Sequence, residues 1–99
     1  MRDFNGTQLM LDGMRIFLRS RLGHARLYLV PCDGGHALFL QAAHGPRVWL
    51  IAEHSKRVRI FKRLEAALTV CQQLEATQVQ VLLVDSEAQQ GMPVEQQAS

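Results

Sequence analysis

Two cysteines and four histidines are the side chains of this sequence that suit metal binding or nucleophilic catalysis. Cys32, Asp33 and His36 lie close together in the chain and have the residue types of a thiolate nucleophile and its base. No zinc-ligand spacing, HExxH pattern or cysteine-enzyme signature surrounds them. Asp33 and Glu53 are also the only acids in residues 14–63, so paired carboxylates for acid–base catalysis are missing. We therefore expect no enzymatic activity, no cofactor and no metal site.

Positive charge is concentrated in the middle of the chain. Ten of the 11 Lys and Arg residues lie in residues 14–63 against two acids, which gives that stretch a net charge of +8. Residues 64–99 carry five acids and no Lys or Arg. Nine of the 11 basic residues are arginine, whose planar guanidinium suits bidentate contact with phosphate or carboxylate. The asymmetry indicates an anionic partner and says nothing about the fold.

Eight of these basic residues are candidate contacts to such a partner. Arg57 and Arg59 alternate with apolar residues and are expected to project from the polar face of a strand. Lys62 and Arg63 follow at the expected start of a helix, where free backbone N–H groups also attract anions. The candidate nucleic-acid-binding residues are Arg57, Arg59, Lys62, Arg63, Lys56, Arg47, Arg19 and Arg15.

Two aromatic residues near these cations, Trp49 and Phe61, would add stacking onto bases if they are partly exposed. No phosphate-binding loop, helix-turn-helix or RNA-recognition motif accompanies them, so nothing predicts readout of base sequence. The alternative interpretation is a solvated sheet face whose charge balances the acidic residues from Glu65 onward.

The elements that position these residues begin with an ambiguous segment, residues 7–22. Its apolar residues recur at helical spacing, with Thr7 suited to cap the start and Gly23 the end. The dipeptide Asp12-Gly13, however, is a strong hairpin signal between apolar residues. We favour the helix because Met, Leu and Arg are good helix formers.

Four strands are expected next, separated by turns rich in Gly and Pro. Pro31 is expected to end the first strand. The third is apolar on both faces, which indicates a central place in the sheet. The four strands are predicted over residues 26–30, 36–42, 47–53 and 57–61.

The strongest helix signal in the chain predicts a helix over residues 63–76, and the β-branched residues of 79–84 predict a final strand. The order is then α-β-β-β-β-α-β. It predicts an α+β two-layer sandwich, with a mainly antiparallel sheet of four or five strands and one or two helices on one face.

Residues 1–85 are expected to form a single domain, and the polar, Gln-rich residues 86–99 a disordered tail. No apolar run approaches the roughly 18 to 20 residues that span a bilayer. The first residues also lack the pattern of a secretory signal. We expect a soluble cytoplasmic protein without a membrane partner. Its small core favours a homodimer formed through edge strands or the Met-rich first segment.

One strand–helix–strand stretch resembles small accessory proteins encoded on bacterial plasmids and integrative conjugative elements. Its residues are Phe61-Lys62-Arg63-Leu64-Glu65-Ala66-Ala67-Leu68, then Leu74, then Val79-Gln80-Val81, and His24-Ala25-Arg26-Leu27-Tyr28-Leu29-Val30-Pro31 upstream is similar in style. The resemblance implies a mobile genetic element and the handling of its DNA or protein machinery. It carries over no site residues.

The sequence thus predicts a non-enzymatic nucleic-acid-binding accessory or regulatory protein that contacts phosphates through an Arg/Lys patch, with DNA favoured over RNA. The alternative is a protein-interaction module or inhibitor that binds an acidic surface of a larger complex. Both hypotheses need the cations to share an exterior surface and to lack carboxylate partners within their own chain.

Overall fold

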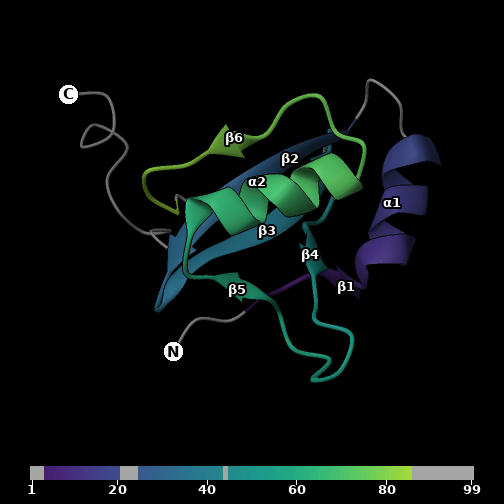
Figure 1. Ribbon diagram of the computed structural model, residues 1–99. Coiled ribbons are helices and arrows are strands. Elements are labelled where there is room, and N and C mark those ends of the chain that lie inside the picture. The colour runs from purple at the N-terminus through teal and green to yellow at the C-terminus, as the bar shows by residue number, and fades with distance from the viewer. Residues whose placement is uncertain (1–3, 21–24, 44, 86–99) are drawn as a thin grey trace.

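The structure, a computed structural model, describes residues 4–20, 25–43 and 45–85. Its helices are α1 (Leu11–Ser20) and α2 (Leu64–Gln73), and its strands are β1 (Thr7–Leu9), β2 (Ala25–Cys32), β3 (Gly35–Ala42), β4 (Val48–Leu50), β5 (Ile60–Phe61) and β6 (Gln80–Val81). All these strands belong to one mixed sheet, and α2 crosses in front of it (Figure 1). The predicted α+β class is confirmed.

The centre of the sheet is antiparallel, and both of its edges are parallel. The strand order is β1-β4-β3-β2-β6, with β5 paired to β3. β2 and β3 form a continuous hairpin, whereas β1 runs parallel to β4 and β6 runs parallel to β2. The expected, mainly antiparallel sheet of four or five strands is therefore found only in part, because β1, which was not expected, brings the number to six and both edge strands pair in parallel.

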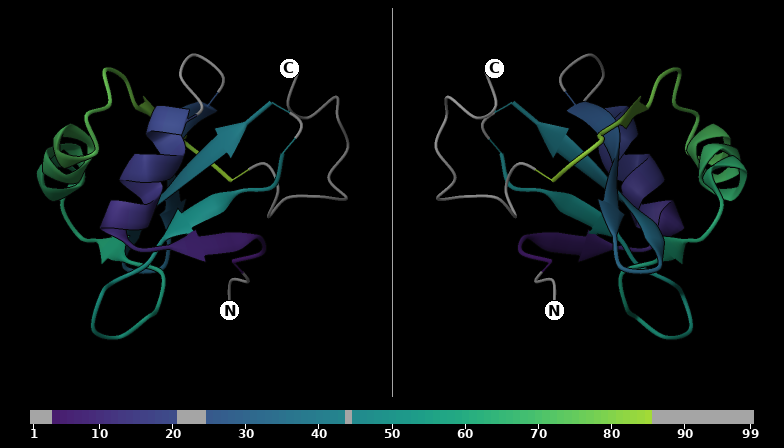
Figure 2. Two further views of the ribbon diagram at one scale, coloured as in Figure 1. Left: turned by 90° about the vertical axis from the view of Figure 1, so that its right-hand side faces the viewer. Right: turned by 90° about the vertical axis from the view of Figure 1, so that its left-hand side faces the viewer.

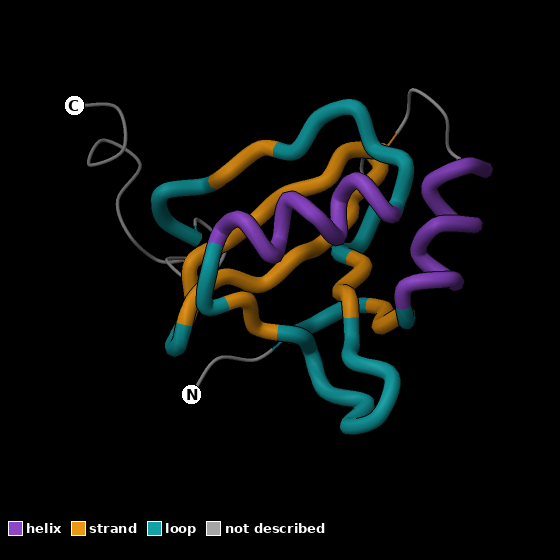
Figure 3. Tube along the Cα trace, in the orientation of Figure 1, coloured by secondary structure: helices purple, strands orange, loops and turns teal. Residues whose placement is uncertain are grey.

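β4 and β5 lie along the same edge of β3. β4 pairs with the C-terminal half of β3, and β5 pairs with its N-terminal half. Between them the chain leaves the sheet as a hairpin that is closed by a bridge between Ile51 and Val58 and projects well away from it (Figure 3). We call residues 51–59 the hairpin. The predicted strands 47–53 and 57–61 are shorter in the sheet than expected, because residues 51–53 and 57–59 belong to the hairpin instead.

The first segment is a helix, as favoured, but a short strand precedes it. Thr7, the expected helix cap, instead pairs with Val48 of β4. The Asp12-Gly13 dipeptide lies within α1 and forms no turn. Glycine costs a helix about 1 kcal/mol, which is less than the roughly 1.5–3 kcal/mol gained by burying a side chain such as the fully buried Met14.

β2 continues through Pro31 to Cys32, beyond the end expected for it. β6 pairs with β2 only at Tyr28 and Leu29, so this end of β2 has a single neighbouring strand. A proline there loses little by lacking an N–H donor.

α2 is shorter than the predicted helix 63–76. Its C-terminus is closed by hydrogen bonds from the N–H of Glu75 to the Gln72 carbonyl and from Ala76 to the Cys71 carbonyl. This is the Schellman pattern, and Glu75 has the left-handed φ of 64° that the pattern requires. Apolar periodicity could not reveal the stop, because glutamate is not the glycine that normally signals it.

The sheet buries apolar side chains on both faces, although burial under helices was expected on one. On the helix side, Met14 of α1 and Val70 of α2 join the same cluster as Leu38. The opposite face has no helix among the described residues, and Figure 2 shows the two termini of the described chain on that side. Its buried apolar members are Val30, Ala37, Phe39 and Trp49.

Among the described helices, none is long and apolar enough to cross a lipid bilayer. The tail predicted for residues 86–99 lies outside the described residues.

Candidate nucleic-acid interface

Arg15 and Arg19 of α1 are occupied by contacts to the end of α2. Arg15 donates through Nε to the Gln73 carbonyl at 2.9 Å and through Nη1 to Asp12 at 3.1 Å. Arg19 Nη2 lies 2.8 and 2.9 Å from the two carboxylate oxygens of Glu75. Both arginines therefore join the two helices, and we leave them out of the candidate interface.

Arg47 is buried on the sheet face opposite the helices. It is 7% exposed, and its Nη2 lies 3.1 Å from Oδ1 of Asp85, which is 6% exposed. Its guanidinium also lies 4.2 Å from the centre of the Phe39 ring and 5.5 Å from that of Trp49. Arg47 is thus neutralised away from solvent and does not share a surface with the other candidates in this conformation.

The other five candidates form an exposed group on one continuous stretch of chain that runs from the hairpin through β5 to the start of α2 (Figure 1). The ion pairs of the described residues involve none of them. Glu53 and Glu65 are the acids that flank this stretch in sequence. We call the group the basic ridge; its members are Lys56, Arg57, Arg59, Lys62 and Arg63.

The hairpin sets the direction of two ridge arginines. The Arg57 carbonyl accepts the Ala52 N–H, and the Arg59 N–H donates to the Leu50 carbonyl, both at 2.9 Å. Side chains alternate along such extended backbone. Val58 packs against the cluster on the opposite face, so Arg57 and Arg59 both point to the helix side.

Arg59 is further positioned by Phe61, whose ring centre lies 4.7 Å from its guanidinium carbon. Such a contact at an exposed site is worth about 0.5–1 kcal/mol. Phe61 is itself 3% exposed and Trp49 1%, so the base stacking expected of them does not occur from this conformation. Both rings are instead taken up by the packing of the sheet.

Lys56 occupies a strained position at the hairpin turn. Its φ is 59°, a left-handed conformation that costs a residue with a Cβ about 1–2 kcal/mol. Its N–H donates to the Ala52 carbonyl at 3.0 Å, and its Nζ lies 3.2 Å from the sulfur of Met10. The turn therefore carries a lysine where glycine or asparagine would fold more easily.

Lys62 and Arg63 lead into α2. Arg63 is the N-cap residue, with φ −120° and ψ 136°, and no side chain accepts a hydrogen bond from the first turn. An uncapped helix start adds positive partial charge next to these two side chains. Anionic groups are stabilised in such a place.

The Cys32 thiol and the His36 imidazole do not lie together as a nucleophile and its general base. Cys32 lies opposite Gly35 and His36 opposite Pro31 in the β2–β3 hairpin, so the two side chains project from opposite faces of the sheet. Burial raises the pKa of the Cys71 thiol, which keeps it protonated within the helix-side cluster. Within the described ranges, which leave out two of the four histidines, no three His, Cys, Asp or Glu side chains converge as a metal site would require.

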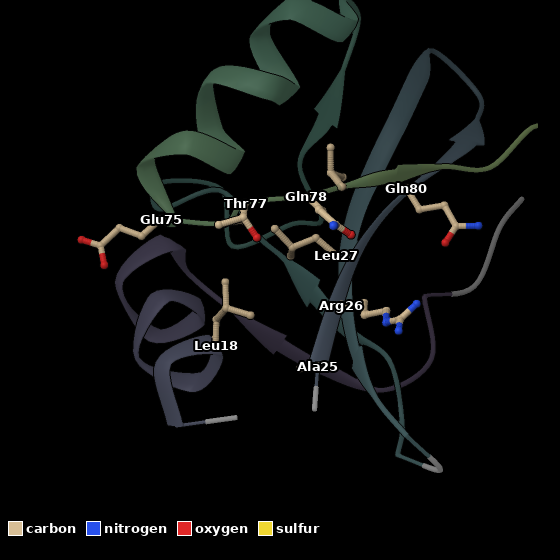
Figure 4. A pocket seen from close by; sticks show the side chains of 10 residues that line it. Leu18, Ala25, Arg26, Leu27, Glu75, Thr77, Gln78 and Gln80 are labelled. Atoms are coloured by element: carbon tan, nitrogen blue, oxygen red, sulfur yellow. The ribbon is translucent and has the colours of Figure 1, made fainter. Parts of the chain in front are cut away.

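The surface of the described chain has hollows, two of which lie near residues discussed above. One, of about 570 Å³, separates β1 and the start of α1 from the hairpin and has Arg59 in its wall. The other, of about 610 Å³, lies between the end of α1, the start of β2 and the loop after α2 (Figure 4). In Figure 4 Leu18 and Leu27 face one another there, whereas the charged ends of Glu75 and Arg26 point outward. Neither hollow gathers a set of catalytic groups.

The interactions of Asp85 and Glu75 could not be found from sequence reasoning. Asp85 lies 38 residues from Arg47, and Glu75 lies 56 residues from Arg19. Only the arrangement of the strands brings each pair together. The one available signal was the strand around Trp49, whose apolar residues on both faces indicate a second buried face.

No protein-family model, no curated protein and no solved structure matches this chain.

Proposed function

We propose that this protein binds nucleic acid through the basic ridge as a non-enzymatic accessory or regulatory protein. The observation that carries the proposal is the division among its cations. Three arginines are held by carboxylates of the chain, whereas the five ridge cations are exposed and form no ion pair among the described residues. The left-handed Lys56 adds weight, because backbone strain kept at an exposed turn is often tied to a binding role.

The size of the ridge fits a short length of nucleic acid. Its members lie within residues 56–63, which span at most about 25 Å of extended chain. A duplex advances about 3.4 Å per phosphate along each strand, so the ridge reaches at most about seven phosphates of one strand. Neutralising five phosphates predicts a slope of log affinity against log salt of about −4.5 on duplex DNA.

The test replaces three ridge arginines and compares them with three matched arginines elsewhere. Arg57→Ala/Arg59→Ala/Arg63→Ala and the control Arg15→Ala/Arg19→Ala/Arg26→Ala both lower the formal net charge from +2 to −1. We expect the salt slope to fall to about −1.8 in the ridge variant and to stay near −4.5 in the control. Equal slopes would mean that net charge, and not the ridge, governs binding.

A protein partner with an acidic surface is the second candidate, and one observation favours it. Leu83 is 91% exposed and Val84 54% exposed directly after the edge strand β6, which another strand could extend. Stoichiometric capture of one acidic protein at moderate salt, with no nucleic acid bound at low salt, would select this function. A second copy of the chain on the same edge would give a homodimer by sedimentation.

The proposed setting is a bacterial plasmid or integrative conjugative element, which the resemblance of residues 61–81 implies. In that setting a small phosphate-binding protein would act in the cytoplasm on the element's DNA. The neighbouring genes are the direct check: genes for replication, partition or transfer are expected, and a chromosomal metabolic operon would contradict the setting.

A further inference from the structure

Three aromatic side chains form a row across the centre of the sheet on the face away from the helices. Tyr28 of β2 pairs in register with Phe39 of β3, which pairs in register with Trp49 of β4. The ring centres of neighbours lie 5.0 and 5.1 Å apart, with the first two rings stacked. We call Tyr28, Phe39 and Trp49 the aromatic row. Aromatic side chains on a sheet serve single-strand-binding proteins as surfaces on which bases stack, although here the Phe39 ring stacks with Tyr28 and lies under Arg47.

The row is covered by short pieces from both ends of the described chain. Phe4 packs edge-on to Trp49 at 4.8 Å between ring centres, and the Asn5 carbonyl accepts the indole N–H at 2.9 Å. Residues 82–85 leave β6 toward the same side (Figure 2). Leu82 packs with the row, and Asp85 pairs with Arg47, which itself lies over Phe39.

Residues 82–85 touch this face mainly at their two ends. The Leu82 N–H donates to the Leu29 carbonyl at 2.8 Å, and Asp85 holds Arg47 at 3.1 Å. Between them Leu83 and Val84 are 91% and 54% exposed, although both are apolar. A segment without regular structure that buries so little of itself has low local stability. We call residues 82–85 the strap.

The basic ridge borders this face. Val58 and Ile60, which alternate with Arg57 and Arg59, pack against the cluster that contains Phe39 and Trp49. Arg57 and Arg59 themselves project to the helix side, so the aromatic row is a surface separate from the ridge, on the other face of the same stretch of backbone.

We propose that the strap is a displaceable cover and that single-stranded nucleic acid replaces it, with bases stacked on the aromatic row and a phosphate in place of the Asp85 carboxylate on Arg47. The inference rests on the proposed function and extends it to a second, single-strand-specific surface. A phosphate accepts the two parallel N–H donors of a guanidinium as a carboxylate does, so Arg47 keeps an anionic partner throughout. Double-stranded nucleic acid cannot offer unstacked bases and would use the ridge alone.

The experiment weakens the strap and reads the change at Trp49, the only tryptophan of the chain. Asp85→Asn removes a carboxylate charge that pairs with Arg47, and Glu53→Gln is its control, because it removes one carboxylate of an exposed hairpin residue. Affinities are measured for oligothymidylate, for oligouridylate and for a duplex, with probes of about 12 nucleotides or base pairs, within the reach of one such site.

We expect Asp85→Asn to bind single strands roughly tenfold or more tightly than the wild type, because a larger fraction of the protein has the strap released. Binding should quench the Trp49 emission. Glu53→Gln should change affinity less than about threefold, as a single screened surface charge does. Duplex affinity should be the same in both variants. Stronger binding of one oligonucleotide would show which of DNA and RNA the surface favours.

A second variant guards against misfolding, since removal of one partner of a buried ion pair destabilises some proteins. Leu82→Ala loosens the other end of the strap and should give the same gain in single-strand affinity. Loss of cooperative unfolding in both variants would overturn the proposal, because it would make residues 82–85 an integral part of the fold.

The outcomes separate this proposal from the proposed function. If the wild type binds duplex through the ridge but Asp85→Asn matches Glu53→Gln and Trp49 emission stays constant, the aromatic surface is refuted and the ridge stands. If the ridge variant keeps the wild-type salt slope while Asp85→Asn gains single-strand affinity and Trp49 emission is quenched, the ridge is refuted and the aromatic surface stands. No binding in any arm refutes both.

Discussion

The approach of β5 to the β2–β3 turn depends on one glycine and gives a matched pair of substitutions. Gly35 has a φ of 150°, and a Cβ added there would lie 2.0 Å from the Phe61 carbonyl oxygen and 2.7 Å from its carbon. Gly34, the preceding residue, has a φ of 89°, but its added Cβ would meet nothing closer than Ile60 at 3.7 Å. Both positions strain an L-residue, and only Gly35 forces the backbone of β5 to move.

The two costs can be estimated separately. Gly34→Ala adds backbone strain of about 1–2 kcal/mol, offset by about 0.4–1 kcal/mol from the less flexible unfolded chain, so we expect a loss of about 1 kcal/mol. Gly35→Ala must also push backbone atoms from 2.0 Å to ordinary contact near 3.4 Å. Strain and overpacking together should cost about 3–5 kcal/mol.

The assay is thermal and urea denaturation of both variants beside the wild type, monitored by circular dichroism and by Trp49 fluorescence. The melting temperature should fall by about 4–8 °C for Gly34→Ala and by at least about 12 °C for Gly35→Ala. Phe61 directly precedes Lys62, so Gly35→Ala should also weaken duplex binding under conditions where it remains folded. Equal losses of stability in the two variants would refute the close packing of β5 on this turn.

Three further predictions concern single residues. Lys56→Asn should leave the free energy of unfolding unchanged or raise it by up to about 1 kcal/mol, because asparagine tolerates the left-handed conformation. Its duplex affinity at about 0.1 M salt should fall roughly threefold to tenfold. A loss of stability with unchanged affinity would contradict the role given to Lys56. Arg19→Ala should lower the free energy of unfolding by only about 0.2–1 kcal/mol in urea denaturation, since the arginine and Glu75 side chains are 61% and 57% exposed. This loss should vanish at high salt. A larger loss that does not depend on salt would contradict the surface ion pair. Burial raises the pKa of Cys71 above its ordinary 9.0, so the folded state holds the thiol proton more tightly than the unfolded state does. The free energy of unfolding should therefore fall as the pH rises beyond 9.0, and Cys71→Ala should flatten that fall. An identical pH profile in both proteins would disprove the raised pKa of Cys71.

Local pattern was enough to predict the elements that carry strong periodicity. The helix around Cys71 and the strands on either side of the Asp33–Gly34 turn were predicted from side-chain spacing and turn chemistry, and the structure has them. The strand at Trp49 was expected at the centre of the sheet because both of its faces are apolar, and it lies within the sheet, between the edge strand β1 and β3. β1 could not be foreseen, since three residues have no periodicity of their own and pair only after β4 exists.

The candidate site was likewise predictable only where local sequence pattern decides whether a side chain is exposed. Exposure of Arg57 and Arg59 follows from strict alternation with Val58, which is local information. The removal of Arg15, Arg19 and Arg47 from the patch depends on carboxylates that only the folded chain brings near them. Spacing along the sequence carries no record of such partners.

Mapping of a bound duplex onto the chain by NMR is the most direct test of the ridge. Titration of isotopically labelled protein with a 12-base-pair duplex, which is longer than the roughly seven phosphates that the ridge can reach along one strand, should move the backbone amide signals of residues 55–65 the most. Signals of α1 and of β6 should move little, and added salt should reverse every shift. Largest shifts on α1 or β6, or none anywhere at low salt, would show that the ridge is not where this protein meets nucleic acid.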